Sequence, residues 1–256
     1  MIDIHSHILP ALDDGAQTLD ESLLMARQAV AEGITTIIAT PHHKHPSYNN
    51  SKLVVEQQVA LLNAELRNHH IPLLIAAGQE IRIHGAMAEE LPKGLDLLPL
   101  HDSHYVLIEF PSSEVPKYAD QLFYDIQVQG YTPIIAHSER NSEFVRNPDR
   151  LYRFIKNGAL SQITAGSLAG KFGRNTQKTS INFLNHNLAH VIASDAHNMT
   201  NRSLQWKAGW KVVEKEFGYE GVEAFMSNSR DIFQNIAIAK LPPERITQRK
   251  KLFGLV

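Results

Sequence analysis

The chain has 256 residues, which is long enough to bury a sizeable core, and α/β barrels of this length commonly form one domain. Its formal net charge of −2 gives no overall attraction to nucleic acid. The absence of cysteine excludes disulfides, thiolate metal ligands and a cysteine nucleophile, so any catalysis must use oxygen and nitrogen groups. We therefore expect a single domain over residues 1–256.

The first residues have no basic segment followed by an apolar one, and no run of the chain reaches the roughly 18 apolar residues of a membrane span. We expect a cytoplasmic protein without membrane insertion. The composition has one unusual feature, 14 histidines, whose positions decide whether they carry a function.

Short apolar runs alternate along the chain with amphipathic segments at 20–32, 52–68, 119–129, 147–157 and 176–185. This alternation is typical of βαβ units and a parallel sheet. Seven runs favour an α/β fold of the distorted (β/α)7, TIM-like barrel type, and an open doubly wound sheet is the alternative. The seven runs are "MIDIH", "ITTIIATPH", "IPLLIAAGQEI", "HYVLIEF", "YTPIIAH", "ALSQITA" and "AHVIASDAH".

Helix boundary residues agree with these segments. Thr18 and Asp20 are candidate caps of the first helix, and Gly33 ends it. Pro148 is a start signal for the 147–157 helix, and Gly158 is its stop signal.

The C-terminal tail, residues 240–256, is basic and contains two prolines. It predicts a short surface helix that begins near Pro243. Such a tail is usually a solvated basic end, and a peripheral contact with a partner or a membrane surface is the alternative.

The first strand carries two histidines. Ile2 and Ile4 alternate with Asp3 and His5, so the strand has an apolar and a polar face. Residues two apart in a strand project to the same side, about 6.6 Å apart, so His5 and His7 can bind one ion. A hydrogen-bonded histidine pair is the alternative.

Each of six strands ends in a residue that can bind a metal, and parallel strands form sites at their carboxyl ends. We therefore predict a metal site at the C-terminal ends of the strands. The candidate ligands are His5, His7, His42, Glu80, Glu109, His137, Asp195 and His197, with Asp14 in the loop after the first strand.

Each candidate has an alternative role. Glu80 and Glu109 follow apolar residues, where an unpaired carboxylate is costly to bury, so we expect a cation or an arginine beside each and favour the cation. His42 could instead pair with His43 or His45. Asp3 is expected to orient a histidine rather than bind metal. No role is assigned to His69, His70, His84, His101, His104, His186 or His190.

Nine candidate ligands exceed the needs of one zinc ion, so more than one metal is expected. Imidazole and carboxylate ligands without thiolate suit manganese, iron or zinc. A cluster of such ions activates water at neutral pH, which favours hydrolysis, with phosphorus as the expected centre. Arg140 and Arg202 follow strand-end ligands by a few residues, and their guanidinium groups match phosphate oxygens. Lys171 is a weaker candidate of the same kind.

These motifs together resemble the PHP (polymerase and histidinol phosphatase) superfamily, in particular its bacterial protein-tyrosine phosphatase branch, the CpsB/YwqE type. The resemblance covers residues 1 to about 239. The matching motifs are H-x-H at His5 and His7, "DDG" with Asp14, "TPH" with His42, "GQE" with Glu80, "IEF" with Glu109, "AHSER" with His137, and "SDAH" with Asp195 and His197.

The resemblance implies a distorted (β/α)7 barrel with three divalent metals, usually manganese, and phosphate contacts from Arg140 and Arg202. It also implies a phosphotyrosine protein as partner, in particular a bacterial tyrosine kinase of a capsule or exopolysaccharide operon. The chain departs from the family at His43, where a relative can carry arginine, and at its basic tail. The implied ligand sets are His5, His7, Glu80 and Asp195; Glu80, Glu109 and His137; and Asp14, His42 and His197.

The resulting hypothesis is a phosphotyrosine phosphatase in which a metal-bridging hydroxide attacks phosphorus while Arg140 and Arg202 hold the phosphate. A phenol has a pKa near 10, so as a leaving group it needs less protonation than an alkoxide, which fits a sequence without an obvious dedicated general acid. A histidinol-phosphate phosphatase or other small-molecule phosphoesterase is one alternative. A nuclease is disfavoured because the sequence has no basic track. A metal-containing kinase-docking module without activity is the remaining alternative.

Overall fold

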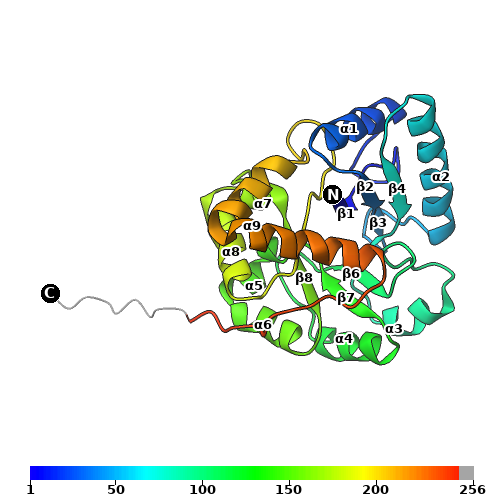
Figure 1. The fold of residues 1–256 in the computed structure, drawn as a ribbon. Helices are drawn as coiled ribbons and strands as arrows, with labels where there is room; N and C mark the ends of the chain where they lie inside the picture. Colours follow the sequence, from blue (N-terminus) through cyan, green and yellow to red (C-terminus); the bar gives the residue numbers. More distant parts are fainter. Residues whose placement is uncertain (248–256) are drawn as a thin grey trace.

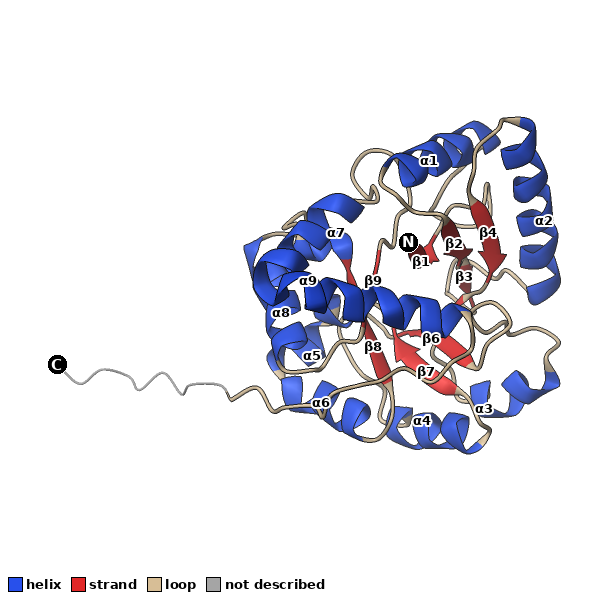
Figure 2. Ribbon diagram, in the orientation of Figure 1, coloured by secondary structure: helices blue, strands red, loops and turns tan. Residues whose placement is uncertain are grey.

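In the computed structural model, which describes residues 1–247, a curled parallel sheet carries helices on its outer side (Figures 1 and 2). Every strand pairing is parallel, so the predicted α/β class is confirmed. The strand orders are β1-β2-β4 and β3-β5-β6-β7-β8-β9. The strands are β1 (Ile2–Ser6), β2 (Thr36–Ala39), β3 (His42–His43), β4 (Leu74–Ala77), β5 (Glu80–Arg82), β6 (Tyr105–Glu109), β7 (Thr132–Ile135), β8 (Leu160–Thr164) and β9 (Val191–Ala193).

Each of the seven predicted apolar runs contains a strand, and two of the runs contain two. The run that holds β2 and β3 is interrupted at Thr40 and Pro41, and the run that holds β4 and β5 is interrupted at Gly78 and Gln79. The two sheets meet where the end of β1 approaches the end of β9. There Ser6 and Ala196 form a parallel bridge, and the His7 N–H donates to the Ala196 carbonyl at 2.8 Å.

The five predicted helical segments are helical. They are α1 (Leu19–Ala31), α2 (Lys52–Asn68), α4 (Ala119–Val128), α6 (Pro148–Lys156) and α8 (Arg174–Asn185). The hydroxyl of Thr18 caps α1 by accepting from the Glu21 N–H at 3.2 Å, while Asp20 lies in the first turn. Gly33 and Gly158 follow their helices with positive φ, as helix-ending glycines do.

A long C-terminal helix, α9 (Trp206–Phe233), was not predicted. Its backbone is not helical at Gly218, which has φ 69°, so two helical segments meet there. Gly209 lets α9 approach α7, because a Cβ at this position would lie 2.8 Å from the Ala165 carbonyl oxygen. Further short elements are α3 (Met87–Glu90), η1 (Leu91–Lys93), η2 (Ser138–Arg140), α5 (Ser142–Arg146) and α7 (Ala165–Leu168).

Buried apolar side chains form two clusters. The larger cluster joins strands and surrounding helices, for example Ile37 of β2 and Leu62 of α2. The smaller cluster is formed mainly by strand residues such as Ile4, Ile38 and Leu107, with Ile232 of α9.

The tail does not form the predicted helix over residues 241–247, and residues 248–256 lie outside the described part of the chain. Proline cannot donate a helical hydrogen bond, and the segment instead packs on the body of the protein. The Glu244 N–H donates to the His186 carbonyl at 2.8 Å, and Arg245 pairs with Asp149. Among the described residues, no helix combines the length and apolar character needed to cross a membrane.

Candidate metal centre

His5 and His7, at the end of β1, form the inner part of the site. Both are almost completely buried, and their Nε2 atoms lie 3.2 Å apart. Their Nδ1–H groups donate away from the site, to Gln162 Oε1 at 3.0 Å and to Asp13 Oδ2 at 2.6 Å. The Nδ1 hydrogen bond of each ring directs Nε2 into the site, where it would give up its proton and offer its electron pair when a metal binds.

Two buried carboxylates approach these rings. Glu80 Oε2 lies 3.4 Å from Nε2 of both His5 and His7, and its Oε1 lies 2.7 Å from His137 Nε2. Asp195 Oδ1 lies 3.3 Å from the same two Nε2 atoms. Glu80 is therefore the carboxylate at the centre of the cluster.

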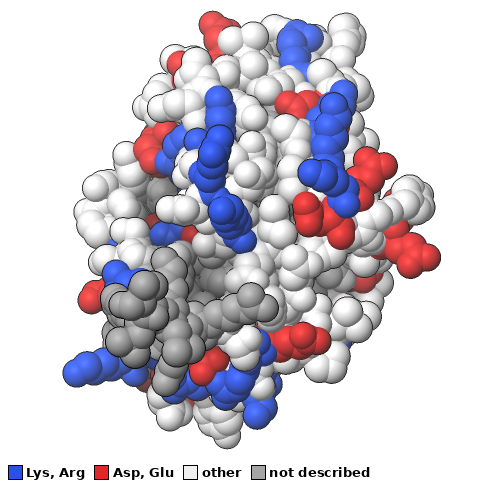
Figure 3. Space-filling model, turned by 90° about the vertical axis from the view of Figure 1, so that its left-hand side faces the viewer, with Lys and Arg blue, Asp and Glu red and all other residues white. Residues whose placement is uncertain are grey.

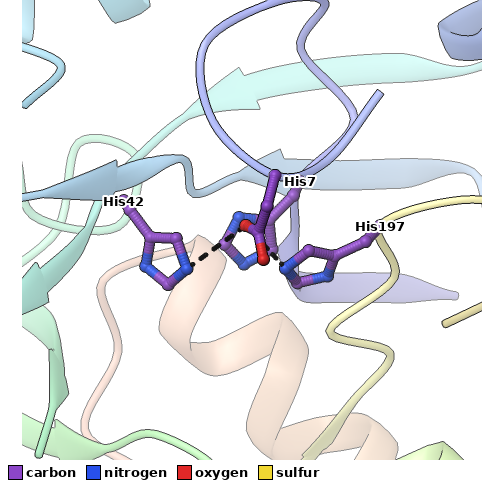
Figure 4. Close-up of side chains that lie close together, drawn as sticks. His7, His42 and His197 are labelled. Atoms are coloured by element: carbon purple, nitrogen blue, oxygen red, sulfur yellow. Dashed lines mark ion pairs between the residues drawn. The ribbon is translucent and has the colours of Figure 1, made fainter. Parts of the chain in front are cut away.

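Three further residues form the outer part of the site. Asp14 Oδ1 lies 3.5 Å from His42 Nε2 and 3.3 Å from His197 Nε2. Figure 4 shows the rings of His42 and His197 on either side of His7. The ligand atoms of His7, Asp14, His42 and His197 all lie within 4.8 Å of one another, as required for a shared ion.

Glu109 has the arginine neighbour that the sequence left open as one alternative, and it also lies near other candidate ligands. Its Oε2 lies 3.9 Å from His42 Nδ1 and 3.0 Å from Arg82 Nη1, so an arginine is beside it. The ligand atoms of His42, Glu80 and Glu109 lie within 4.8 Å of one another. The resemblance implied a ligand set of Glu80, Glu109 and His137. In the structure His42 is the histidine that groups with Glu80 and Glu109, and His137 contacts Glu80.

A metal cluster fits these residues, because several of their buried polar atoms have no hydrogen-bond partner among the described residues. Burying such atoms unpaired is costly. The His197 Nδ1–H donates to the Asp195 carbonyl at 3.0 Å, so the Nε2 atom of this ring also points into the site. The atoms without a hydrogen bond are His42 Nδ1, Glu80 Oε2, Asp195 Oδ1 and His197 Nε2, which face one another, and Glu109 Oε2, which is ion-paired with Arg82.

The charges of the site keep its carboxylates ionised. Burial raises the pKa of Glu80, but the neighbouring charges of His5 and His42 outweigh it and hold this pKa well below the usual range. Burial likewise opposes ionisation of Asp195, whose pKa Arg140 holds well below its usual range. Burial and the charge of His7 lower the pKa of His197 to about 4. Ionised carboxylates and a neutral His197 are the forms that bind metal.

Three residues support the ligands and were not singled out by the sequence. Asp13 Oδ2 accepts from the His7 ring and from the His42 N–H at 3.0 Å, and its Oδ1 accepts from the Gly15 N–H at 2.9 Å. The Gln162 side chain also accepts from the His137 N–H at 3.0 Å. Only glycine fits at position 15, because a Cβ there would lie 2.1 Å from the His7 carbonyl oxygen. The available signal was the position of Asp13 and Gly15 beside Asp14.

Asp3, expected to orient a histidine, reaches His5 through its backbone N–H and not through its ring. Its carboxylate accepts from the Ser194 N–H at 2.9 Å and from the Ser194 hydroxyl at 2.5 Å, and from the backbone N–H of His5 at 3.4 Å. The register shift between Asp3 and Ser6 breaks the simple alternation of the strand. Asp3 therefore holds the end of β9 that carries Asp195.

Arg140 and Arg202 lie at the open side of the cluster. Arg140 pairs with Asp195 Oδ2, and Arg202 lies 2.9 Å from Asp14 Oδ2 and 3.4 Å from Asp195 Oδ2. Both line a cavity of about 360 Å³, together with Asp14, His42 and His137. Lys171 does not line this cavity.

Part of the cavity lining is apolar and aromatic. Phe110, Ile135 and Phe144 form this part. His45 stacks on His42 with a ring separation of 4.7 Å, so His42 does contact this neighbour. His43 is buried and lies 3.3 Å from Asp96 instead. The cavity thus combines cationic, metal-binding and apolar groups.

Comparisons with known proteins were made for the sequence and for the fold. A family model described as "Capsular polysaccharide synthesis, CpsB/CapC" matches residues 1–234. The tyrosine-protein phosphatase YwqE of Bacillus subtilis is 48% identical over 254 residues, which cover 99% of each chain. CapC of Staphylococcus aureus is 43% identical over 258 residues, with complete coverage of both chains.

Among solved structures, one described as showing YwqE from Bacillus subtilis and CpsB from Streptococcus pneumoniae, "unique metal-dependent tyrosine phosphatases", superposes with a TM-score of 0.95. It is 48% identical, and the match covers 97% of this chain and 100% of the other. The tail lies beyond the matched family model, but the alignment with YwqE reaches over almost the whole chain. Compared with YwqE, the tail is therefore not an extension of the chain.

Proposed function

Because the chain belongs to the CpsB/CapC family of capsular polysaccharide synthesis, we propose that it is a metal-dependent protein-tyrosine phosphatase. The observation that carries this proposal is a set of buried, unpartnered nitrogen and oxygen atoms beneath a cavity lined by two arginines. Such a site combines metal ligands with groups that match phosphate oxygens.

The ligands would be eight residues at the strand ends and Asp14 in the loop after β1. The proposal includes three divalent ions, of which manganese is the expected metal. When bound, such ions supply an activated water and neutralise the charge of the phosphate. The same proposal includes the (β/α)7 barrel, in which β2 with β3 and β4 with β5 are counted as two interrupted strands. The metal ligands are His5, His7, Asp14, His42, Glu80, Glu109, His137, Asp195 and His197.

The residues of the chain itself bind and orient the substrate. The Arg140 side chain is 22% exposed and is ion-paired with Asp195. The Arg202 side chain is 30% exposed and is ion-paired with Asp14, so both guanidinium groups are oriented and still reach the cavity. Their guanidinium groups would hold the phosphate oxygens, and the apolar wall at Phe110 would hold the phenyl ring. The phenolic oxygen has a pKa near 10, so it needs less protonation to leave than an alkoxide does.

We further propose that the substrate is a phosphotyrosine protein, in particular a bacterial tyrosine kinase or its targets in capsule or exopolysaccharide synthesis. The family membership and the phosphatase relatives support this assignment. A cytoplasmic location stays a prediction from the sequence.

The experiment that tests the function is phosphate release with manganese from a phosphotyrosine peptide, a phosphoserine peptide and histidinol phosphate. We expect selective turnover of the phosphotyrosine peptide, and its loss in His5→Ala and Arg140→Ala. Arg67→Ala, an exposed arginine of α2, is the matched control and should keep full activity. Preferred turnover of histidinol phosphate would contradict the assignment in favour of a small-molecule phosphatase, and no turnover of any phosphoester would favour a docking module.

A further inference from the structure

The charges of the chain are strongly segregated along the sequence. Residues 150–213 contain nine lysines and arginines but one acidic residue, Asp195, which is buried in the site. The rest of the chain holds the other 26 acidic and 16 basic residues. The small net charge therefore conceals a basic segment.

Part of this segment forms an exposed row on α8 and the loop before it. Lys171, Arg174 and Lys178 are all exposed; Arg174 and Lys178, four residues apart on α8, lie on one side of the helix, and Lys171 lies in the loop before it. Within residues 1–247, no carboxylate lies within ion-pair distance of these three side chains. Figure 3 looks onto the side of the molecule that carries α7 and α8, where lysine and arginine side chains form a column on a largely uncharged surface.

This row begins beside the cavity. The ring of Phe172, which follows Lys171, lies 5.3 Å from Cζ of Arg140. The Thr176 hydroxyl donates to the Phe172 carbonyl at 3.1 Å, which ties the loop to α8, and α8 packs against η2, the element that carries Arg140. α8 has no capping side chain and no acidic residue in its first turn, so its N-terminus adds positive partial charge to the same place.

We propose that Lys171, Arg174 and Lys178 form a docking surface for acidic residues that flank the phosphotyrosine of the protein substrate. This proposal rests on the proposed function, because the phosphotyrosine in the cavity positions the flanking peptide. Arg174 and Lys178 lie about 6 Å apart along the helix axis, close to the roughly 6.6 Å between alternate residues of an extended peptide. The surface is therefore specific for acidic residues at alternate positions.

The size of the surface favours a polypeptide over other anionic partners. Tight nucleic-acid binding commonly uses 6–10 phosphate contacts, and recognition of anionic lipids uses clusters of about 4–8 basic residues. Three side chains next to a cavity for one phosphate match a short acidic peptide better than either polymer or membrane.

The test compares two phosphotyrosine peptides that differ only in glutamate or glutamine at alternate flanking positions, with free phosphotyrosine as a third substrate. We expect kcat/KM of the wild type to be about tenfold higher for the glutamate peptide, since two or three exposed charge pairs contribute this much. The double variant Arg174→Glu/Lys178→Glu should abolish this preference and leave turnover of free phosphotyrosine within twofold. Arg67→Glu/Lys215→Glu is the matched control, with the same charge change at exposed sites elsewhere, and should keep the preference.

Equal turnover of both peptides by the wild type would overturn the docking surface while leaving the phosphatase assignment intact. A preference that survives in the double variant, or is lost equally in the control, would also overturn it. If none of the three substrates is turned over, the proposed function itself fails. Binding of phosphatidylglycerol vesicles or single-stranded DNA that the double variant loses, without any peptide preference in the wild type, would assign the surface to that partner instead.

Discussion

The substitution Asp13→Asn tests the residue that orients two of the proposed ligands. The Asp13 carboxylate accepts three hydrogen bonds, from the His7 ring at 2.6 Å and from the N–H groups of His42 and Gly15 at 3.0 and 2.9 Å. Because these bonds use both oxygens, an amide must direct its NH2 group at one or two donors. The substitution also removes the charge that stabilises the His7 ring in its orientation.

The expected magnitude follows from this loss. Replacing an outer partner of a ligating histidine typically costs 10–100-fold in metal affinity, which corresponds to about 1.4–2.7 kcal/mol. We therefore expect half-maximal activation of phosphate release to require 10–100-fold more manganese in Asp13→Asn.

The assay is a manganese titration of the metal-free protein with a phosphotyrosine peptide as substrate. Asp20→Asn, the same chemical change in the exposed first turn of α1, is the control and should titrate like the wild type. A manganese requirement of Asp13→Asn within twofold of the wild type would refute the role of Asp13.

Three further outcomes are expected. Gly15→Ala should abolish manganese activation, because its Cβ would lie 2.1 Å from the His7 carbonyl oxygen. Gly85→Ala is the control and should keep the activation, because a Cβ there meets open space. Equal manganese titrations of the two variants would contradict this prediction. Arg140→Lys keeps the charge but loses the planar fork, so kcat/KM for the phosphotyrosine peptide should fall about tenfold at unchanged metal content, and unaltered kinetics would exclude a phosphate contact. His190 is buried and, owing to burial and then the charge of Lys240, has a pKa lowered to about 3, so it takes up a proton only in the unfolded chain as the pH falls below about 6.5. This linkage removes about 2 kcal/mol of stability between pH 7 and pH 5; urea unfolding with chelator should show a smaller loss for His190→Asn than for the exposed control His70→Asn, and equal losses would refute the assignment.

The sequence could predict the parallel α/β fold because apolar runs and amphipathic segments alternate with clear boundaries. The helix of residues 52–68 has the predicted bounds. The long helix α9 was missed because it is interrupted at Gly218 and carries exposed lysines and glutamates close to its apolar positions. Its role in closing the smaller apolar cluster through Ile232 depends on tertiary packing, which no local pattern contains.

The candidate ligands could be found because carboxyl ends of parallel strands meet at one end of the sheet. The supporting residues could not, because their partners are distant in sequence. Gln162, for example, connects the His5 ring on β1 with the backbone N–H of His137 after β7. The contact of Asp3 with Ser194, 191 residues away in the sequence, likewise has no local signal.

The measurement that tests the account most directly is the dependence of turnover on metal. Protein freed of metal by a chelator and returned to buffer should release no phosphate from a phosphotyrosine peptide, and added manganese should restore release in the wild type but not in His5→Ala or Asp195→Asn. Full turnover by the metal-free protein would contradict the account.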